Sequence, residues 1–211
     1  MSETKRHGLD VFYPIVPDAT WVARIMPLGV CTLQLRVKDV PVDGVRSQIG
    51  ASLAIARRHG CQLIVNDYWR EAIDAGADYV HLGQEDLAAA DVAAIKRAGM
   101  RLGISTHSEE ELASALAIEP DYVALGPIYE TKLKAMGWAP QGLARIGAWK
   151  ARIGRLPLVA IGGLTPERAD GVVAAGADSV AVITDFMTAQ DPEARIELWL
   201  AWAEAQRRSR H

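Results

Sequence analysis

Three polar side chains alternate along the stretch QLRVK, at Gln34, Arg36 and Lys38. Residues two apart on an extended strand point to the same face, so the three would share one surface. Arginine donates hydrogen bonds in a planar fork and lysine supplies a compact positive charge, which together suit phosphate or diphosphate. A solvated strand end with a salt bridge has the same pattern, so the stretch alone leaves both interpretations open.

Two aspartates, Asp67 and Asp86, follow two neighbouring apolar stretches, QLIVN and VHLG. Proteins commonly hold Mg²⁺ through one or two carboxylates together with phosphate oxygens of the substrate. The pair therefore suggests a magnesium site beside an anion. Each aspartate could instead cap the helix that follows it, and capping and metal binding can coexist.

A double-glycine turn, AIGGLTPER, leads into an expected helix. Backbone N–H groups at such a helix start favour an anion, and a phosphate site after the last two strands recurs in eight-stranded barrels. A tight turn that needs positive φ is the alternative. His81 and His107 could serve as acid–base groups, although single histidines more often have a structural role.

Eight short apolar runs must position these residues. They are rich in valine, isoleucine and leucine, as strands buried on both faces are. The runs span residues 11–16, 30–36, 62–67, 78–83, 101–106, 121–127, 157–163 and 178–184.

Segments with helical spacing of apolar residues separate these runs. Ser108 and Thr165 are placed to cap two of them, and glycines stand where several should stop. Trp199 and Trp202, in the last segment, are expected to cover the outside of the fold or an oligomer contact. The expected helices span residues 51–59, 68–75, 86–98, 108–118, 143–153, 166–175 and 192–207.

Strict alternation of strand and helix implies a parallel sheet. Eight such units in 211 residues predict an α/β fold, a compact (β/α)₈ TIM barrel, as a single domain over residues 1–211 with a polar tail at 1–10. An open doubly wound sheet is the alternative, but the first strand lacks the glycine-rich turn of dinucleotide-binding folds. In such barrels the active site lies at the carboxyl ends of the strands, where the polar residues above are found.

The composition argues against several partners. Net charge is −3 and the basic residues are scattered, so a charge-driven nucleic-acid partner is not expected. No apolar run reaches the ~18 residues of a membrane span, and the polar N-terminus has no signal-peptide pattern, which favours a cytoplasmic protein. Cys31 and Cys61 are expected to be buried free thiols.

Six stretches, in the same order and at the same spacing, resemble the thiamine-phosphate synthase family: QLRVK, VNDYW, VHLGQEDL, GISTH, LGPIYETKLK and VAIGGLTPE. The resemblance runs from about residue 11 to residue 190. It implies a (β/α)₈ barrel that joins hydroxymethylpyrimidine diphosphate to thiazole phosphate, with Mg²⁺ as cofactor and thiamine phosphate and diphosphate as products. The implied partners are these small molecules, and a homo-oligomer is compatible with the pattern.

The resemblance also assigns the site residues. Those implied to hold the pyrimidine substrate, mainly through its diphosphate, are Gln34, Arg36, Lys38, Asn66 and Lys134, with Ser105 beside the pyrimidine. Those implied to take part in catalysis are Arg36, Lys38, Lys134 and Ser105. Asp67 and Asp86 would hold Mg²⁺. Those implied to surround the thiazole phosphate are Thr131, Gly163, Ile183 and Thr184.

One departure and two alternatives bear on this assignment. The family usually has Thr-x-Thr-Lys after the sixth strand, whereas this chain has Leu133 at the second threonine. A related thiazole tautomerase would carry its acid–base histidine where Pro127 stands here. A catalytically silent barrel that binds thiamine intermediates or a partner protein is the other alternative, and Leu133 is its best support. Gln84 and Glu85 are expected to shape a turn.

Overall fold

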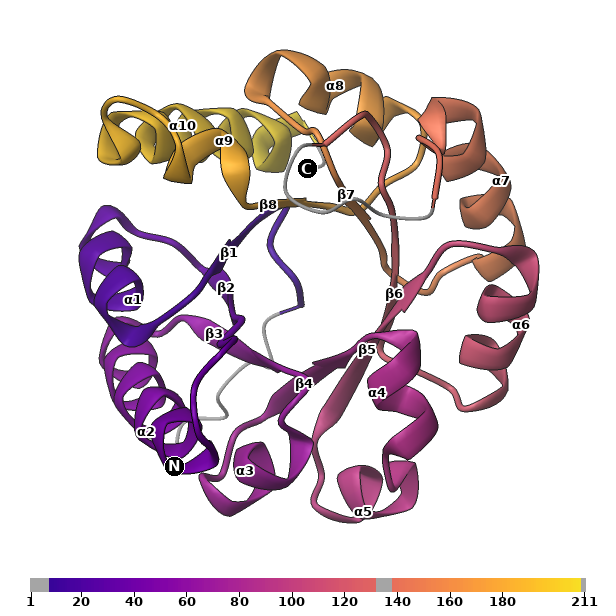
Figure 1. Ribbon diagram of the computed structural model, residues 1–211. Coiled ribbons are helices and arrows are strands. Elements are labelled where there is room, and N and C mark those ends of the chain that lie inside the picture. The colour runs from indigo at the N-terminus through magenta and orange to yellow at the C-terminus, as the bar shows by residue number, and fades with distance from the viewer. Residues whose placement is uncertain (1–7, 132–137, 210–211) are drawn as a thin grey trace.

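A closed parallel barrel of eight strands is the centre of the structure, a computed structural model that describes residues 8–131 and 138–209 (Figure 1). Each strand pairs in parallel with its chain neighbours, and β8 pairs with β1. The barrel and its single domain are thus confirmed, and the open sheet is excluded. The strands are β1 (Phe12–Val16), β2 (Thr32–Leu35), β3 (Gln62–Asn66), β4 (Tyr79–Leu82), β5 (Arg101–Thr106), β6 (Tyr122–Leu125), β7 (Leu158–Ile161) and β8 (Ser179–Val182).

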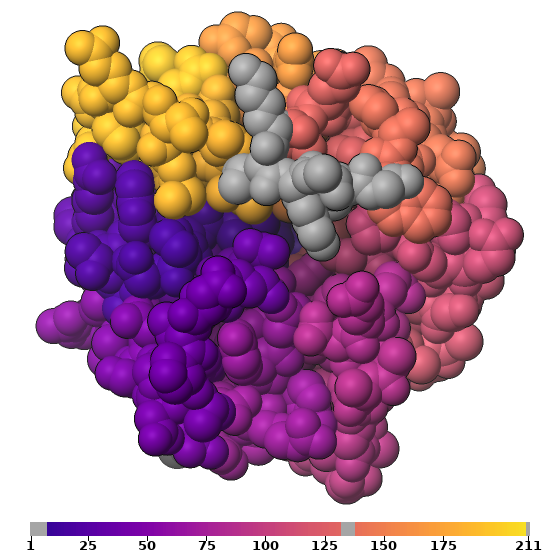
Figure 2. Space-filling view, viewed as in Figure 1, coloured from indigo at the N-terminus to yellow at the C-terminus, as the bar shows by residue number. Residues whose placement is uncertain are grey.

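Helices surround the barrel on the outside, and the space-filling view shows the chain progressing around the axis in sequence order (Figure 2). A short 3₁₀ helix, η1 (Met26–Leu28), follows the first of them. The helices are α1 (Ala19–Ile25), α2 (Val42–His59), α3 (Trp69–Asp74), α4 (Gln84–Ala89), α5 (Val92–Arg97), α6 (Glu109–Ala117), α7 (Gly142–Ile153), α8 (Pro166–Ala174), α9 (Thr184–Met187) and α10 (Pro192–Ser209).

The helix boundaries correct the prediction in two places. The expected helix over 86–98 is two helices, because Ala90 is extended and the Asp91 side chain accepts a hydrogen bond from the Ala94 N–H at 2.8 Å, which starts α5. The helix expected at 51–59 begins at Val42, and its buried face extends back to Val45. The short helices α1 and α9 were not expected at all.

The larger hydrophobic core lies between the strands and the helices. Trp199 of α10 is fully buried there and stacks on Phe12 of β1, with ring centroids 5.3 Å apart. Trp202 packs edge-on against Trp199 and donates a hydrogen bond to Asp170 at 2.8 Å. Trp199 therefore covers the outside of the barrel, as its sequence position predicts.

A smaller core fills the inside of the barrel and contains three tyrosines, Tyr13, Tyr79 and Tyr122. Tyr122 fits because Gly103 on the neighbouring strand has no side chain: a Cβ atom there would lie 2.1 Å from the tyrosine ring. The interior of the barrel thus has space for tyrosine rings, and it places their hydroxyl groups inside the barrel.

The two cysteines are free, as expected, but neither is fully buried. Cys61 is partly buried, and burial raises the pKa of its thiol to about 12, so it stays protonated at neutral pH. Cys31 is exposed, which contradicts the prediction; it lies just before β2, outside the hydrophobic core.

Hydrogen bonds join the first and the last of the described segments. Residues 1–7 of the expected polar tail lie outside the described residues. Asp10 accepts two hydrogen bonds from Arg207 of α10, at 3.0 and 3.1 Å.

Among the described residues, no helix is both long and apolar enough to cross a membrane.

Candidate active site

The carboxyl end of β2 supplies the first group of predicted residues. Gln34 lies in the strand and is buried, whereas Arg36 and Lys38 follow the end of the strand at Leu35. The Lys38 ammonium lies 2.5 Å from the Asp67 carboxylate. Within residues 8–131 and 138–209, the partly buried Arg36 guanidinium has no carboxylate partner. Arg36 is therefore available to an anionic ligand.

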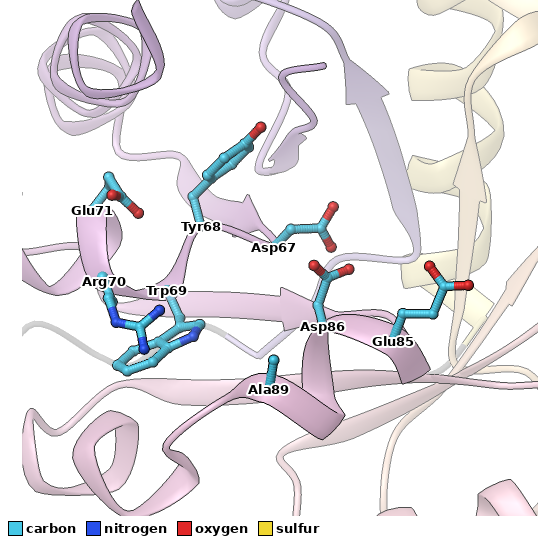
Figure 3. A pocket seen from close by; sticks show the side chains of 8 residues that line it. All are labelled: Asp67, Tyr68, Trp69, Arg70, Glu71, Glu85, Asp86 and Ala89. Carbon is cyan, nitrogen blue, oxygen red and sulfur yellow. The ribbon is translucent and has the colours of Figure 1, made fainter. Parts of the chain in front are cut away.

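The ends of β3 and β4 bring Asp67 and Asp86 together. Asp67 follows β3 with a left-handed φ of 66°, and its N–H donates to the His81 carbonyl at 2.9 Å. Asp86 lies in the first turn of α4 and points toward Asp67 (Figure 3). Burial, reinforced by repulsion from the Asp67 carboxylate, raises the pKa of Asp86. The pair favours a positive charge between its members.

The helix-capping alternative for the two aspartates is wrong. The residues that precede α3 and α4 are Tyr68 and Gly83, and neither helix has a side-chain cap. The aspartates instead line one side of a pocket of about 250 Å³ (Figure 3). Neither carboxylate therefore caps the helix that follows it.

The aspartate pair suits a metal ion that arrives with a phosphate ligand. No group of three or more histidine, cysteine, aspartate or glutamate side chains in the described part of the chain could enclose an ion. Two carboxylates leave the other positions to water and phosphate oxygens, which is the usual arrangement for Mg²⁺. The residues therefore fit magnesium better than a metal that needs an all-protein cage.

Ser105, near the end of β5, is hydrogen-bonded to one residue of β4 and to one residue of α4. Its Oγ lies 2.8 Å from Nε2 of His81, and its carbonyl accepts a hydrogen bond from Gln84 at 2.5 Å. Gln84 therefore fixes the end of β5, in keeping with the expected turn-shaping role. Burial lowers the pKa of His81 to about 4, so the imidazole is neutral at neutral pH.

The second histidine lies at the rim. His107 is bonded to Glu111 through its ring Nδ1 at 2.8 Å, and its ring stacks on Trp138 with centroids 5.5 Å apart. Trp138 is the first described residue after the gap at 132–137. His107 thus lies between the start of α6 and the segment that precedes α7.

The glycine turn after β7 is held tightly against the segment after β6. Gly162 and Gly163 both have positive φ, 103° and 64°. The Gly162 carbonyl accepts a hydrogen bond from Tyr129 at 3.0 Å, and the Gly163 carbonyl accepts one from Arg168 at 2.6 Å. The two glycines therefore form a turn that requires positive φ, as one of the two interpretations predicted. Such a turn is compatible with an anion site.

The other residues assigned to the thiazole phosphate lie at neighbouring strand ends. Ile183 and Thr184 are half-buried at the start of α9, directly after β8. Thr131 is half-buried in the segment after β6. Lys134 and Leu133 lie outside the described residues, so the predicted role of Lys134 stays a prediction.

Substituting Gly163 with alanine is expected to lower the melting temperature by several degrees. A Cβ atom there would lie 2.5 Å from the Glu130 carbonyl oxygen, and the left-handed backbone adds strain of about 1–3 kcal/mol. Each kcal/mol corresponds to roughly 2–4 °C in a domain of this size. Gly50→Ala is the matched control: it is helical, a Cβ meets nothing within 4 Å, and stability should rise slightly. Equal melting temperatures for both variants would contradict this account.

Fold and site together define a class: a (β/α)₈-barrel protein whose polar mouth, at the carboxyl ends of its strands, suits phosphorylated small molecules. The comparison with protein families narrows this class. The family model described as thiamine monophosphate synthase matches residues 13–186. The chain belongs to that family.

Individual relatives agree with the family. Thiamine-phosphate synthase from Rhizobium etli is 58% identical over 92% of this chain and 95% of its own length. The protein of the same name from Cronobacter sakazakii is 49% identical over 85% of each chain. Among solved structures, thiamine phosphate pyrophosphorylase from Pyrococcus furiosus superposes with a TM-score of 0.80 at 26% identity, covering 92% of this chain and 95% of that one.

Proposed function

We propose that this protein catalyses the thiamine-phosphate synthase reaction. It condenses 4-amino-2-methyl-5-(diphosphooxymethyl)pyrimidine with 4-methyl-5-(2-phosphooxyethyl)thiazole, giving thiamine phosphate and diphosphate. The observation that carries the proposal is the facing aspartate pair, with Lys38 bonded to Asp67, in a chain 58% identical to a synthase over most of its length. It acts as a transferase on two small molecules.

The leaving diphosphate determines the task of the charged residues. Asp67 and Asp86 would hold Mg²⁺, which when bound supplies positive charge to the diphosphate oxygens. Arg36 and Lys38 donate hydrogen bonds to the same oxygens and so favour departure of the diphosphate with the bonding electron pair. Lys134, by resemblance, adds a third cation.

The remaining residues orient the two reacting rings. Gln34, Asn66 and Ser105 hold the pyrimidine with its methylene carbon toward the thiazole. Thr131, Gly163, Ile183 and Thr184 hold the thiazole phosphate. The thiazole nitrogen then forms the new bond to the methylene carbon. The reaction needs no side-chain nucleophile, so catalysis rests on positioning and on neutralisation of the leaving group.

The two alternatives receive less support. A tautomerase would need its acid–base histidine at Pro127, and it would have no use for the aspartate pair with Arg36 and Lys38. A silent binding barrel rests on Leu133 alone. The relatives named above carry the name of the synthase.

A coupling assay tests the proposal. The protein, both substrates and Mg²⁺ are expected to yield thiamine phosphate, and EDTA should abolish the yield because the aspartate pair then lacks its cation. Excess Mg²⁺ added after EDTA is the control and should restore it. Folded protein that gives no product would support the silent barrel, and isomerisation of the thiazole precursor would support the tautomerase.

A further inference from the structure

A continuous chain of hydrogen bonds crosses the inside of the barrel beneath the mouth. Gln34 Nε2 donates to the Tyr13 hydroxyl at 2.8 Å, and the Tyr13 and Tyr122 hydroxyl oxygens are 3.0 Å apart. The Tyr122 hydroxyl lies 2.7 Å from His81 Nδ1, and His81 Nε2 lies 2.8 Å from Ser105 Oγ. Two residues assigned to the pyrimidine thus form the ends of one buried chain.

The number of protons gives this chain a direction. Gln34 donates to the Tyr13 oxygen, so the single Tyr13 hydroxyl proton must go to the Tyr122 oxygen. The Tyr122 proton then goes to Nδ1 of His81. His81 therefore carries its own proton on Nε2 and donates it to Ser105. The Ser105 hydroxyl proton remains free for a ligand.

As long as the Gln34 amide N–H donates to Tyr13, the other proton arrangements leave a buried hydroxyl proton without an acceptor. If His81 carried a proton on Nδ1, Tyr122 would donate to Tyr13, and the Tyr13 oxygen would receive two donors. The Tyr13 proton would then lack an acceptor at a fully buried position, which costs about 1–3 kcal/mol. The reverse chain is satisfied only if the Gln34 carboxamide turns its oxygen to Tyr13.

The packing of the rings holds the chain in place. His81 stacks on Tyr122 with centroids 5.5 Å apart and an interplanar angle of 17°, and Tyr13 meets Tyr122 edge-on at 6.2 Å. Gly103 leaves the space that Tyr122 occupies. The hydroxyl and imidazole positions are therefore fixed before any ligand arrives.

We propose that Tyr13, Tyr122 and His81 are positioning residues that fix Ser105 as a hydrogen-bond donor toward the substrate ring. The inference rests on the proposed function and deepens it. The ligand atom favoured opposite Ser105 carries a lone pair, as a pyrimidine ring nitrogen does, because a ring N–H there would give the Ser105 proton no acceptor on the ligand.

The tautomer of His81 tests the direction without any substrate. Full-length protein labelled with ¹⁵N-histidine is recorded in a two-bond ¹H–¹⁵N correlation spectrum at neutral pH. The His81 signals are identified by their absence in His81→Gln. A neutral ring protonated at Nε2 is expected. An imidazolium, or a ring protonated at Nδ1, would overturn the proposal.

Removal of one hydroxyl tests the role in binding. Tyr122→Phe removes the donor to Nδ1, so both neutral tautomers should appear and KM for the pyrimidine diphosphate should rise about tenfold. KM for the thiazole phosphate should not change. Tyr79→Phe is the matched control: it removes a hydroxyl from the same interior but leaves the chain of hydrogen bonds intact. Unchanged KM and tautomer in Tyr122→Phe would refute the positioning role.

A double-mutant cycle shows whether the effect passes through Ser105. In a Ser105→Ala background, Tyr122→Phe should add little to the rise in KM, whereas full additivity would count against the proposal. If Tyr122→Phe does not fold, Tyr13→Phe replaces it in the cycle. A Nε2-protonated His81 in a protein that forms no thiamine phosphate would refute the proposed function and leave the direction of the chain standing.

Discussion

Replacing Asp67 with asparagine is expected to lower kcat for thiamine phosphate formation by about 10²–10³-fold, or about 2.7–4 kcal/mol of barrier. The change removes one of the two facing carboxylates and with it the attraction for a cation (Figure 3). Asparagine has nearly the same shape and tolerates the left-handed φ of 66° at this position, so the fold should persist. The rate is measured at saturating substrates over a range of Mg²⁺ concentrations.

The matched control for this prediction is Asp43→Asn. Asp43 lies in the first turn of α2 and its side chain is 90% exposed, so kcat should stay within a factor of two. The Mg²⁺ concentration for half-maximal rate should rise only in the Asp67 variant. If both variants kept the wild-type rate and the same Mg²⁺ dependence, Asp67 would not be a metal ligand.

Replacing Arg36 with alanine is expected to lower turnover more than tenfold, at least about 1.4 kcal/mol of barrier. Arg36 is half-buried, follows β2 two residues before Lys38, and has no carboxylate partner in the described ranges, so its charge is available to the leaving diphosphate. Arg36→Lys should recover only part of the rate, because lysine lacks the planar fork. Steady-state kinetics with each substrate varied in turn measures the effect.

Arg97→Ala provides the comparison for Arg36. Arg97 lies on α5 with a 70% exposed side chain, and its only described ion pair is a loose one of 3.7 Å to Asp91. It should leave kcat and both KM values unchanged. Unchanged turnover in Arg36→Ala would remove Arg36 from the mechanism.

The barrel and the location of its mouth could be predicted from the sequence because both follow from local patterns. Each strand is a short apolar run, and polar residues such as Asn66 and Ser105 stand at or near the carboxyl ends of several of them. Closure of a parallel sheet then gathers these ends at one rim. Asp67 and Asp86 could be paired in advance for this reason.

The hydrogen-bond chain inside the barrel could not be predicted in this way. Tyr13, His81 and Tyr122 lie far apart in the sequence, and a single tyrosine in an apolar strand is too common to signal a role. Their contact depends on strand register and on the space left by Gly103. The signal that existed was a histidine inside a strand, two residues before Gly83.

Helix boundaries failed for a local reason. An alanine-rich stretch such as 88–94 has helical propensity throughout, so periodicity predicts one helix. The competing interaction is the Asp91 side chain, which bonds the Ala94 N–H and begins a new helix. A single side-chain hydrogen bond thus outweighs the propensity of several alanines.

The Lys38–Asp67 contact means that the ligand-free mouth carries its own counter-ion. A divalent cation that enters between Asp67 and Asp86 competes with this ammonium, so its affinity for the free protein is reduced. A diphosphate gives Lys38 another partner and removes the competitor. Cation and diphosphate should therefore strengthen each other's binding, and by thermodynamic reciprocity each does so by the same factor. The aspartate pair should therefore bind a divalent cation mainly when the diphosphate substrate is also bound.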